Sequence, residues 1–242
     1  MQKIKIMLPA YNEELSLPEL LKSIEDAKNN FALNVEVLVV NDGSKDATLT
    51  ITQQLAQKKN WIKVLDLQPN RGLAGAMREG LKESVKDMAD DDIIITMDAD
   101  NSHPPALIFR MITQIREGSD IVIASRYCNG SRILGLTSYR KFLSNGAGYL
   151  FKIFKPIKGV RDYTCGYRAY RTKLIRKAHE YYKDHFIEQQ GFGCMAEILL
   201  KLRRFNPIIH ELPFILRYDQ KLGVSKMNVS KTVRQTLKLI IS

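Results

Sequence analysis

The stretch DIIITMDADNSHPP, residues 92–105, decides the fold. Its apolar run from Ile93 to Met97 predicts a buried strand. The run ends on Asp98 and Asp100, and side chains two residues apart in an extended chain point the same way. We therefore expect two carboxylates to converge at the carboxyl end of a core strand, which is the edge where open α/β sheets bind their ligands.

This pair of aspartates predicts a divalent metal site. Two nearby carboxylates repel each other unless a cation lies between them. Mg²⁺ and Mn²⁺ prefer hard oxygen ligands, and Mg²⁺ often needs only one or two carboxylates together with the phosphates of its ligand. The alternative is a solvated acidic turn before the helix that starts near Pro105, and the Asp-x-Asp pattern alone does not exclude it.

The segments around this stretch alternate between strand and helix patterns. Apolar, β-branched runs predict strands at residues 3–10, 35–40, 62–67, 93–98 and 120–124. Helical patterns follow at residues 46–58, 73–88 and 105–117. Strands that alternate with helices predict a doubly wound, mostly parallel α/β sheet with right-handed crossovers.

The pattern changes after Arg126. Glycine, serine and arginine dominate residues 127–137, and residues 139–153 have the apolar spacing of an amphipathic helix. Residues 161–171 are polar, cationic and aromatic. Helices are expected near residues 172–184 and 194–204, a strand at 208–216, and a last amphipathic segment at 229–241.

Composition gives weaker constraints. The chain has 242 residues, and 37 lysines and arginines against 26 acids give a net charge of +11, which favours anionic partners without choosing among them. An odd count of 3 cysteines suggests free thiols in a reducing compartment, and they form no metal pattern with the 4 histidines. The N-terminus does not resemble a signal peptide, and no run approaches the ~20 apolar residues of a spanning helix.

Three strand ends carry motifs that fit together. They are Pro9-Ala10-Tyr11-Asn12-Glu13, Asn41-Asp42-Gly43-Ser44 with Asp46, and Asp98-Ala99-Asp100. This set resembles the family 2 inverting glycosyltransferases of the GT-A fold, whose motifs read P-x-Y/F-N-E, D-D/N-G-S-x-D and D-x-D. Ser125-Arg126-Tyr127, residues 162–168 (DYTCGYR) and Gly223 to Lys226 look like the dolichol-phosphate mannosyltransferase branch and its bacterial relatives.

The resemblance implies roles for individual residues. A nucleotide sugar would be bound by the following side chains and backbone positions: Pro9, Ala10, Tyr11, Glu13, Asp42, Asp98, Ala99, Asp100, Arg126 and Lys226. The metal would be held by Asp98 and Asp100, with Ser102 at the position where the branch often has a third ligand. Gln220 stands where the branch has an arginine, and either Arg217 or Lys221 can substitute for it.

The chemistry of the acceptor follows from the charges. Inverting transfer is one in-line displacement, and a hydroxyl acceptor needs a general base. A phosphate acceptor is already anionic near pH 7 and needs cations instead; for that role we predict Arg126, Arg140 and Arg168. The catalytic residues expected are Asp100, Arg126 and Glu197. For Glu197, a general base and an ion pair with Lys201 one turn further on are equally compatible with the sequence.

The expected enzyme moves a hexose from GDP-mannose or a UDP-hexose to a polyprenyl phosphate, with Mg²⁺ or Mn²⁺ as cofactor. A glycosyltransferase with a hydroxyl acceptor is the alternative. A phosphatase of the haloacid dehalogenase type is disfavoured because three strand–helix units precede the Asp-x-Asp motif. A non-catalytic basic module that binds lipid or nucleic acid is disfavoured too, because acidic strand tips repel a polyanion, and no nucleic-acid partner is expected.

The resemblance also predicts the domain organisation and the cellular location of the protein. We expect one GT-A domain over residues 1–228, with a nucleotide-sugar half at 1–110 and an acceptor half at 111–228, followed by an amphipathic helix at 229–242. The tail of a polyprenyl phosphate stays in the bilayer, so we expect a cytoplasmic protein that lies on the cytoplasmic face of the membrane. Residues 139–154 and 229–241 would contact the lipid.

Overall fold

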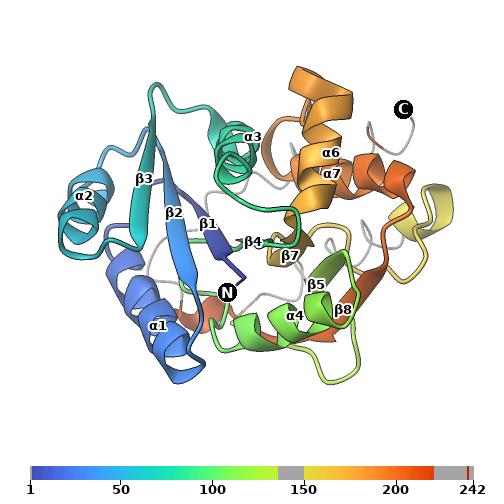
Figure 1. Cartoon of the computed structure of the whole chain (residues 1–242), viewed down its shortest axis with the longest axis horizontal. Coiled ribbons are helices and arrows are strands. Elements are labelled where there is room, and N and C mark those ends of the chain that lie inside the picture. Colours follow the sequence, from blue (N-terminus) through green and yellow to red (C-terminus); the bar gives the residue numbers. More distant parts are fainter. Residues whose placement is uncertain (1, 136–149, 221–238, 240–242) are drawn as a thin grey trace.

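A seven-stranded sheet forms the centre of the computed structural model, which describes residues 2–135, 150–220 and 239 (Figure 1). The strand order is β3-β2-β1-β4-β7-β5-β8. Every neighbouring pair is parallel except the two that involve β7, which runs antiparallel to both β4 and β5. The strands are β1 (Ile4–Ala10), β2 (Val35–Asp42), β3 (Ile62–Leu67), β4 (Ile93–Thr96), β5 (Ile121–Ser125), β7 (Arg168–Arg171) and β8 (Ile209–Pro213).

Helices cover both faces of this sheet, which is why its central strands are almost continuously apolar. Figure 1 shows α1 (Leu17–Asn30) and α4 (Leu107–Arg116) on one face. The other face carries α3 (Gly72–Ser84), α6 (Thr172–Tyr182) and α7 (Cys194–Leu202). Beside β3, at the edge of the sheet, lies α2 (Thr48–Lys58). The doubly wound, mostly parallel α/β sheet predicted from the sequence is confirmed.

The register brings the strand ends to one edge of the sheet. Ala10 at the end of β1 pairs with Asn41 of β2, and Met7 pairs with Thr96 at the end of β4. Because β7 is antiparallel, it begins where its neighbours end, with Arg168 opposite Thr96 and Ile123. The loop before β7, residues 162–167, therefore lies at the same edge as the carboxyl ends of β1, β2, β4 and β5.

Three short elements differ from the sequence-based expectation. The single strand predicted at residues 208–216 is two strands, because Pro213 has no N–H to continue the ladder of β8. The second part, β9 (Ile215–Arg217), pairs in parallel with β6 (Arg132–Leu134) in a separate two-stranded sheet. Neither β6 nor β7 was predicted, because segments of three and four residues are too short to show an alternating pattern.

The acceptor-side segments are only partly described. Across residues 2–135, 150–220 and 239, the structure contains no helix that is long and apolar enough to cross a bilayer. Residues 150–154 are helical and form the visible end of the amphipathic stretch expected at 139–154. Arg140, Lys226 and nearly all of the segment at 229–242 lie outside the described residues.

Candidate active site

The tip of β4 presents the two aspartates differently. The Asp98 side chain is 41% exposed, and its backbone nitrogen donates to Nδ1 of His103 at 3.1 Å. Asp100 is only 6% exposed, and its Oδ1 accepts hydrogen bonds from the backbone nitrogen of Ser102 at 3.1 Å and from the Ser102 hydroxyl at 2.6 Å. Asn101 between them has a φ of 61°, a left-handed conformation that asparagine tolerates. The turn thus fixes Asp100 and leaves Asp98 open to solvent.

These oxygens fit a divalent cation that also binds a phosphate ligand. The described part of the chain contains no group of three or more His, Cys, Asp or Glu side chains placed to hold a metal. Two carboxylates are enough for Mg²⁺ or Mn²⁺ when substrate phosphates and water complete the shell. Ser102 is 1% exposed and donates its proton to Asp100, so it supports that carboxylate from behind. The sequence-based assignment of Ser102 as a third ligand is not favoured by this geometry.

The motifs that follow β1 and β2 hold each other in place. The backbone nitrogen of Asn12 donates to Oγ of Ser44 at 3.0 Å, and the backbone nitrogen of Lys45 donates back to Oδ1 of Asn12 at 2.7 Å. The backbone nitrogen of Glu13 donates to the hydroxyl of Thr48 at 2.8 Å. Two segments more than 30 residues apart in the chain therefore form one rigid rim at the edge of the sheet.

Asp42 closes this rim at the end of β2. Its side chain is 3% exposed, and its Oδ1 accepts the backbone N–H of Arg71 at 2.7 Å, just before α3. Burial raises the pKa of Asp42, and the N–H groups of Arg71 and Gly72 offset this only in part. Gly43 next to it has a φ of +63°, and a Cβ there would lie 2.7 Å from the nitrogen of Asn70, so only glycine fits.

The small residues of the same motifs are buried. Ala10 is 1% exposed and Ala99 2% exposed, so each can meet a ligand only through its backbone. Pro9 is half-buried, as is Tyr11. The structure thus gathers the predicted nucleotide-sugar residues of β1, β2 and β4 at one edge.

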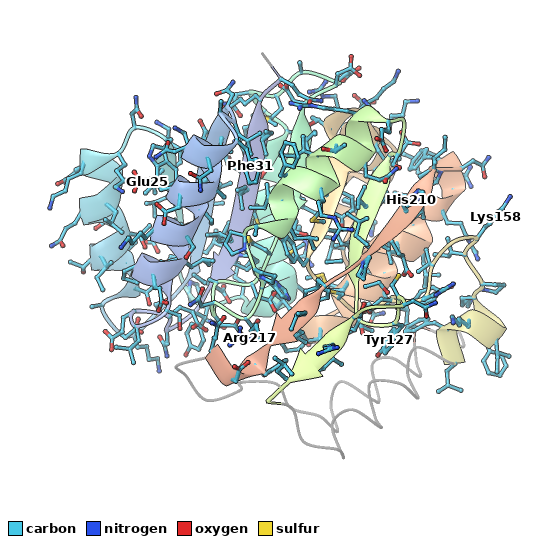
Figure 2. The ribbon with its side chains drawn as sticks, turned by 90° about the horizontal axis from the view of Figure 1, so that it is seen from below. Glu25, Phe31, Tyr127, Lys158, His210 and Arg217 are labelled. Carbon is cyan, nitrogen blue, oxygen red and sulfur yellow. The ribbon has the colours of Figure 1, made fainter. Side chains whose placement is uncertain are left out.

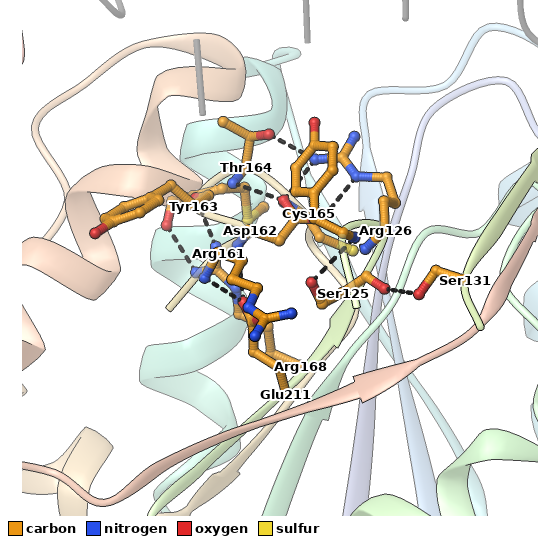
Figure 3. Close-up of polar contacts among 12 residues, drawn as sticks. Ser125, Arg126, Ser131, Arg161, Asp162, Tyr163, Thr164, Cys165, Arg168 and Glu211 are labelled. Carbon is orange, nitrogen blue, oxygen red and sulfur yellow. Dashed lines mark hydrogen bonds and ion pairs between the residues drawn. The ribbon is translucent and has the colours of Figure 1, made fainter. Parts of the chain in front are cut away.

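Arg126 follows β5 at this edge and forms a paired, buried contact with Asp162 (Figure 3). Nε of Arg126 donates to Oδ2 of Asp162 at 2.8 Å, and Nη2 donates to Oδ1 at 2.6 Å and to the hydroxyl of Thr164 at 2.6 Å. The Arg126 side chain is 15% exposed and that of Asp162 0%. Burial alone would lower the pKa of Arg126, but the charge of Asp162 more than offsets it and the net pKa is raised.

Two predicted site residues have other roles. Arg168 is fully buried, with Nη1 donating to the carbonyl of Met195 at 2.7 Å and Nη2 to the carbonyl of Tyr163 at 2.8 Å. The prediction that Arg168 binds an acceptor phosphate is therefore corrected. The residue lies on β7, between β4 and β5, in a segment for which the sequence showed only a polar, cationic and aromatic composition.

Glu197 is likewise held inside the structure, at 4% exposure. Its carboxylate accepts backbone N–H groups from Glu188 at 3.0 Å and Gln189 at 2.8 Å, and pairs with Nζ of Lys201 at 2.8 Å. Of the two readings left open by the sequence, this geometry supports the ion pair. The two hydrogen bonds to Glu188 and Gln189 also attach the loop that precedes α7 to the Glu197 carboxylate.

Comparison with known proteins identifies the family and supports the fold. Residues 5–178 match the sequence profile of glycosyl transferase family 2, and the chain belongs to that family. It is 34% identical over 239 residues to a dolichol-phosphate mannosyltransferase of Pyrococcus furiosus, covering 98% of this chain but only 62% of that relative. It is 31% identical to an undecaprenyl-phosphate mannosyltransferase of Micrococcus luteus, covering 93% of this chain and 88% of the relative.

Solved structures support the fold alone. Glucosyl-3-phosphoglycerate synthase of Mycobacterium tuberculosis, crystallised with Mn²⁺, UDP and phosphoglyceric acid, aligns with a TM-score of 0.66 at 19% identity over 99% of this chain and 76% of that one. Mannosyl-3-phosphoglycerate synthase of Rubrobacter xylanophilus aligns with a TM-score of 0.66 at 17% identity over 99% of this chain and 73% of that one. The GT-A fold expected from the strand-end motifs is confirmed.

Proposed function

We propose that this protein is an inverting, metal-dependent glycosyltransferase that moves a hexose from a nucleotide sugar to a polyprenyl phosphate. The observation that carries the proposal is the arrangement of charge at one edge of the sheet. Asp98 and Asp100 follow β4, and Arg126 follows β5, so a metal-bound diphosphate would lie at the same edge of the sheet as the cation of Arg126. The relatives named as dolichol-phosphate and undecaprenyl-phosphate mannosyltransferases support mannose as the sugar. GDP-mannose is therefore the first donor to test and a UDP-hexose the second.

The roles of the residues follow from this arrangement. Asp98 and Asp100 would hold Mg²⁺ or Mn²⁺, which would neutralise the charge that develops on the leaving diphosphate. Tyr11, Glu13 and Asp42 would line the rim where the nucleoside binds. Arg126 would face the phosphate of the acceptor, which attacks without a general base. The absence of a general base from this mechanism is consistent with the contacts of Glu197, whose carboxylate binds Lys201 and two backbone N–H groups.

The acceptor half also offers a surface for a bilayer. Ile153 is 53% exposed and Phe154 60% exposed, with Lys152 and Lys158 exposed nearby. Burying each apolar side chain in lipid would contribute roughly 1.5–3 kcal/mol, and each lysine near an anionic leaflet about 1 kcal/mol. Figure 2 shows Lys158 at one edge of the molecule, well apart from Phe31. We propose peripheral attachment to the cytoplasmic face of a membrane through the surface around residues 152–158.

A donor and acceptor panel tests the proposal. GDP-mannose, UDP-glucose and UDP-galactose are incubated with farnesyl phosphate or with farnesol, each with Mg²⁺, with Mn²⁺ or with excess chelator. We expect metal-dependent transfer of one sugar to farnesyl phosphate and none to farnesol. Transfer that requires a hydroxyl acceptor, or transfer that persists in chelator, contradicts the proposal.

A further inference from the structure

We propose that Asp162 is a positioning residue of the reaction, which holds Arg126 in the one orientation that presents its remaining N–H groups to the acceptor phosphate. This inference rests on the proposed function. Asp162 lies 36 residues from Arg126 in sequence, in the loop before β7, and touches no group expected to react. Its effect would pass entirely through the guanidinium that it binds.

The contact constrains Arg126 at both ends. Oδ2 of Asp162 accepts the backbone N–H of Arg126 at 3.0 Å and its Nε–H at 2.8 Å, so one oxygen fixes the start of the side chain and its head group. Oδ1 accepts Nη2 at 2.6 Å. A carboxylate that binds a guanidinium through two parallel hydrogen bonds also fixes its plane.

A count of donors shows which part of the guanidinium remains for a ligand. A guanidinium has five N–H groups. Nε–H and the two N–H groups of Nη2 are taken by Asp162 and Thr164. Among the described residues, none forms a hydrogen bond or ion pair with Nη1, and the ring of Tyr127 lies 5.5 Å from the guanidinium carbon. The two N–H groups of Nη1 are therefore the pair that can bind an anionic ligand, and their direction is set by Asp162.

Asp162 itself is held rigidly (Figure 3). Its Oδ1 also accepts the backbone N–H groups of Thr164 at 3.2 Å and Cys165 at 3.0 Å. On the other side, Oε1 of Glu211 accepts the backbone N–H groups of Arg161 at 2.7 Å and Asp162 at 2.8 Å. Such a carboxylate cannot follow a moving arginine, so the arginine must conform to it.

The same loop also reaches the metal side of the site. A Cβ placed on Gly166 would lie 3.3 Å from Oδ1 of Asp98. One rigid loop thus passes close to Asp98 near its end and orients Arg126 near its start. Because the loop holds Arg126 and leaves no room for a larger side chain next to Asp98, it would influence the separation between the carboxylate expected to hold the donor and the cation expected to hold the acceptor.

The test compares the steady-state constants of the wild type with those of four single variants and one double variant, Arg126→Lys with Asp162→Asn, using farnesyl phosphate and the donor found active in the panel. Asp162→Asn keeps an acceptor for the loop N–H groups but loses the charge that binds Arg126. Thr164→Val is the milder variant and removes a single bond to Nη2. Arg126→Lys removes the guanidinium. Asp120→Asn is the matched control, because Asp120 pairs with Arg171 at 3.6 Å and lies before β5, at its other end.

We expect Asp162→Asn to raise the KM for farnesyl phosphate about 10-fold, with a smaller rise for Thr164→Val and a donor KM within about 2-fold of wild type. In the Arg126→Lys background, Asp162→Asn should add less than about 2-fold, because a residue that acts only through Arg126 has nothing left to orient. Asp120→Asn should leave the KM for farnesyl phosphate unchanged even where it lowers Tm.

The outcomes separate the two proposals. If the wild type transfers sugar to farnesyl phosphate but Asp162→Asn changes both KM values equally, or keeps its full effect in the Arg126→Lys background, Asp162 is merely structural and the inference is overturned. If Asp162→Asn changes only the donor KM, the pair belongs to the diphosphate site. A wild type that neither binds nor glycosylates farnesyl phosphate rejects the proposed function, and the inference falls with it.

Discussion

The hydroxyl of Ser102 donates a 2.6 Å hydrogen bond to Oδ1 of Asp100. Its own backbone nitrogen donates to the same oxygen at 3.1 Å, so one face of that carboxylate is already occupied. Oδ1 is the oxygen that the turn holds in place. A metal would then be bound by Asp100 from the face that Ser102 does not cover. This relationship gives Asp100 and Ser102 different roles, which substitution can separate.

Asp100→Ala should abolish divalent-dependent binding of the nucleotide sugar while the fold persists. We expect turnover to fall by about 10²-fold or more, roughly 2.7 kcal/mol of transition-state stabilisation. Donor binding is measured by calorimetry with and without Mn²⁺. The control is Asp91→Ala. Asp91 precedes β4, whereas Asp100 follows it, and the Asp91 side chain is 88% exposed. Full activity of Asp100→Ala, or of the wild type in excess chelator, would remove the metal role.

Ser102→Ala should have a much smaller effect. It removes one hydrogen bond to a charged group, and such bonds contribute about 1.5–3 kcal/mol when they are fully formed. Because the backbone N–H of Ser102 still holds Asp100, we expect turnover to fall about 5-fold, with the affinity for Mn²⁺ reduced by a similar factor. A loss as large as that of Asp100→Ala would show that Ser102 binds the metal directly.

Glu197→Gln tests the role of the buried carboxylate. The substitution removes the negative charge of the carboxylate that pairs with Lys201. It also replaces one of the two oxygens of this carboxylate, which accepts the backbone N–H groups of Glu188 and Gln189. We expect the free energy of unfolding to fall by about 1–3 kcal/mol and kcat on a phosphate acceptor to change less than about 3-fold. Glu188→Gln is the control, because the Glu188 side chain is 54% exposed and also pairs with Lys201. A collapse of kcat with normal donor binding would identify Glu197 as a general base.

His179 on α6 makes the stability of the fold depend on pH. Burial, with a contribution from Lys82, lowers its pKa to about 4. Within the described part of the chain, its buried Nε2 has no hydrogen-bond partner. Because the folded pKa lies below the unfolded value of 6.5, the neutral ring favours the folded state at pH 7, and this contribution is lost as the pH falls from about 6.5 towards about 4.

We expect the free energy of unfolding to be about 1–2 kcal/mol lower at pH 5 than at pH 7 on account of this group, after allowing for the part of the ring that solvent reaches. Urea titrations at both pH values measure it. His179→Gln should flatten the pH dependence, whereas His210→Gln, at an exposed position, should not. If the free energy of unfolding depends on pH equally in the wild type and in His179→Gln, the ring is already solvated in the folded protein.

Ile153→Ser with Phe154→Ser tests the membrane surface by flotation with vesicles of mixed neutral and anionic lipid. We expect the wild type to float at low salt, to detach as salt rises because the lysines act through screened charge, and the double variant to stay in solution. Phe31→Ser is the control, since Phe31 is 42% exposed and lies well apart from Lys158 (Figure 2). A folded wild type that does not bind anionic vesicles at low salt leaves a separate membrane partner or a soluble acceptor as the better explanation.

The sequence by itself determined those features that depend on neighbouring residues. The run from Ile93 to Met97 followed by Asp98 and Asp100 was enough to predict a buried strand with two carboxylates at its end. The alternation of apolar strands with helices was enough to predict the doubly wound sheet. Both are local patterns, because side-chain direction in a strand and helical periodicity are properties of short segments.

Only the tertiary structure decided the features that depend on contacts between distant segments. The four residues of β7 form a strand because β4 and β5 offer ladders on both sides, and this buries Arg168. The partner of Arg126 is Asp162, 36 residues away, and the partners of Glu197 lie in a preceding loop. The sequence shows that an arginine carries a positive charge, but it does not show which groups surround that charge. Whether it binds a ligand, a carboxylate or backbone carbonyls is set by which groups the folded chain brings to within hydrogen-bond distance.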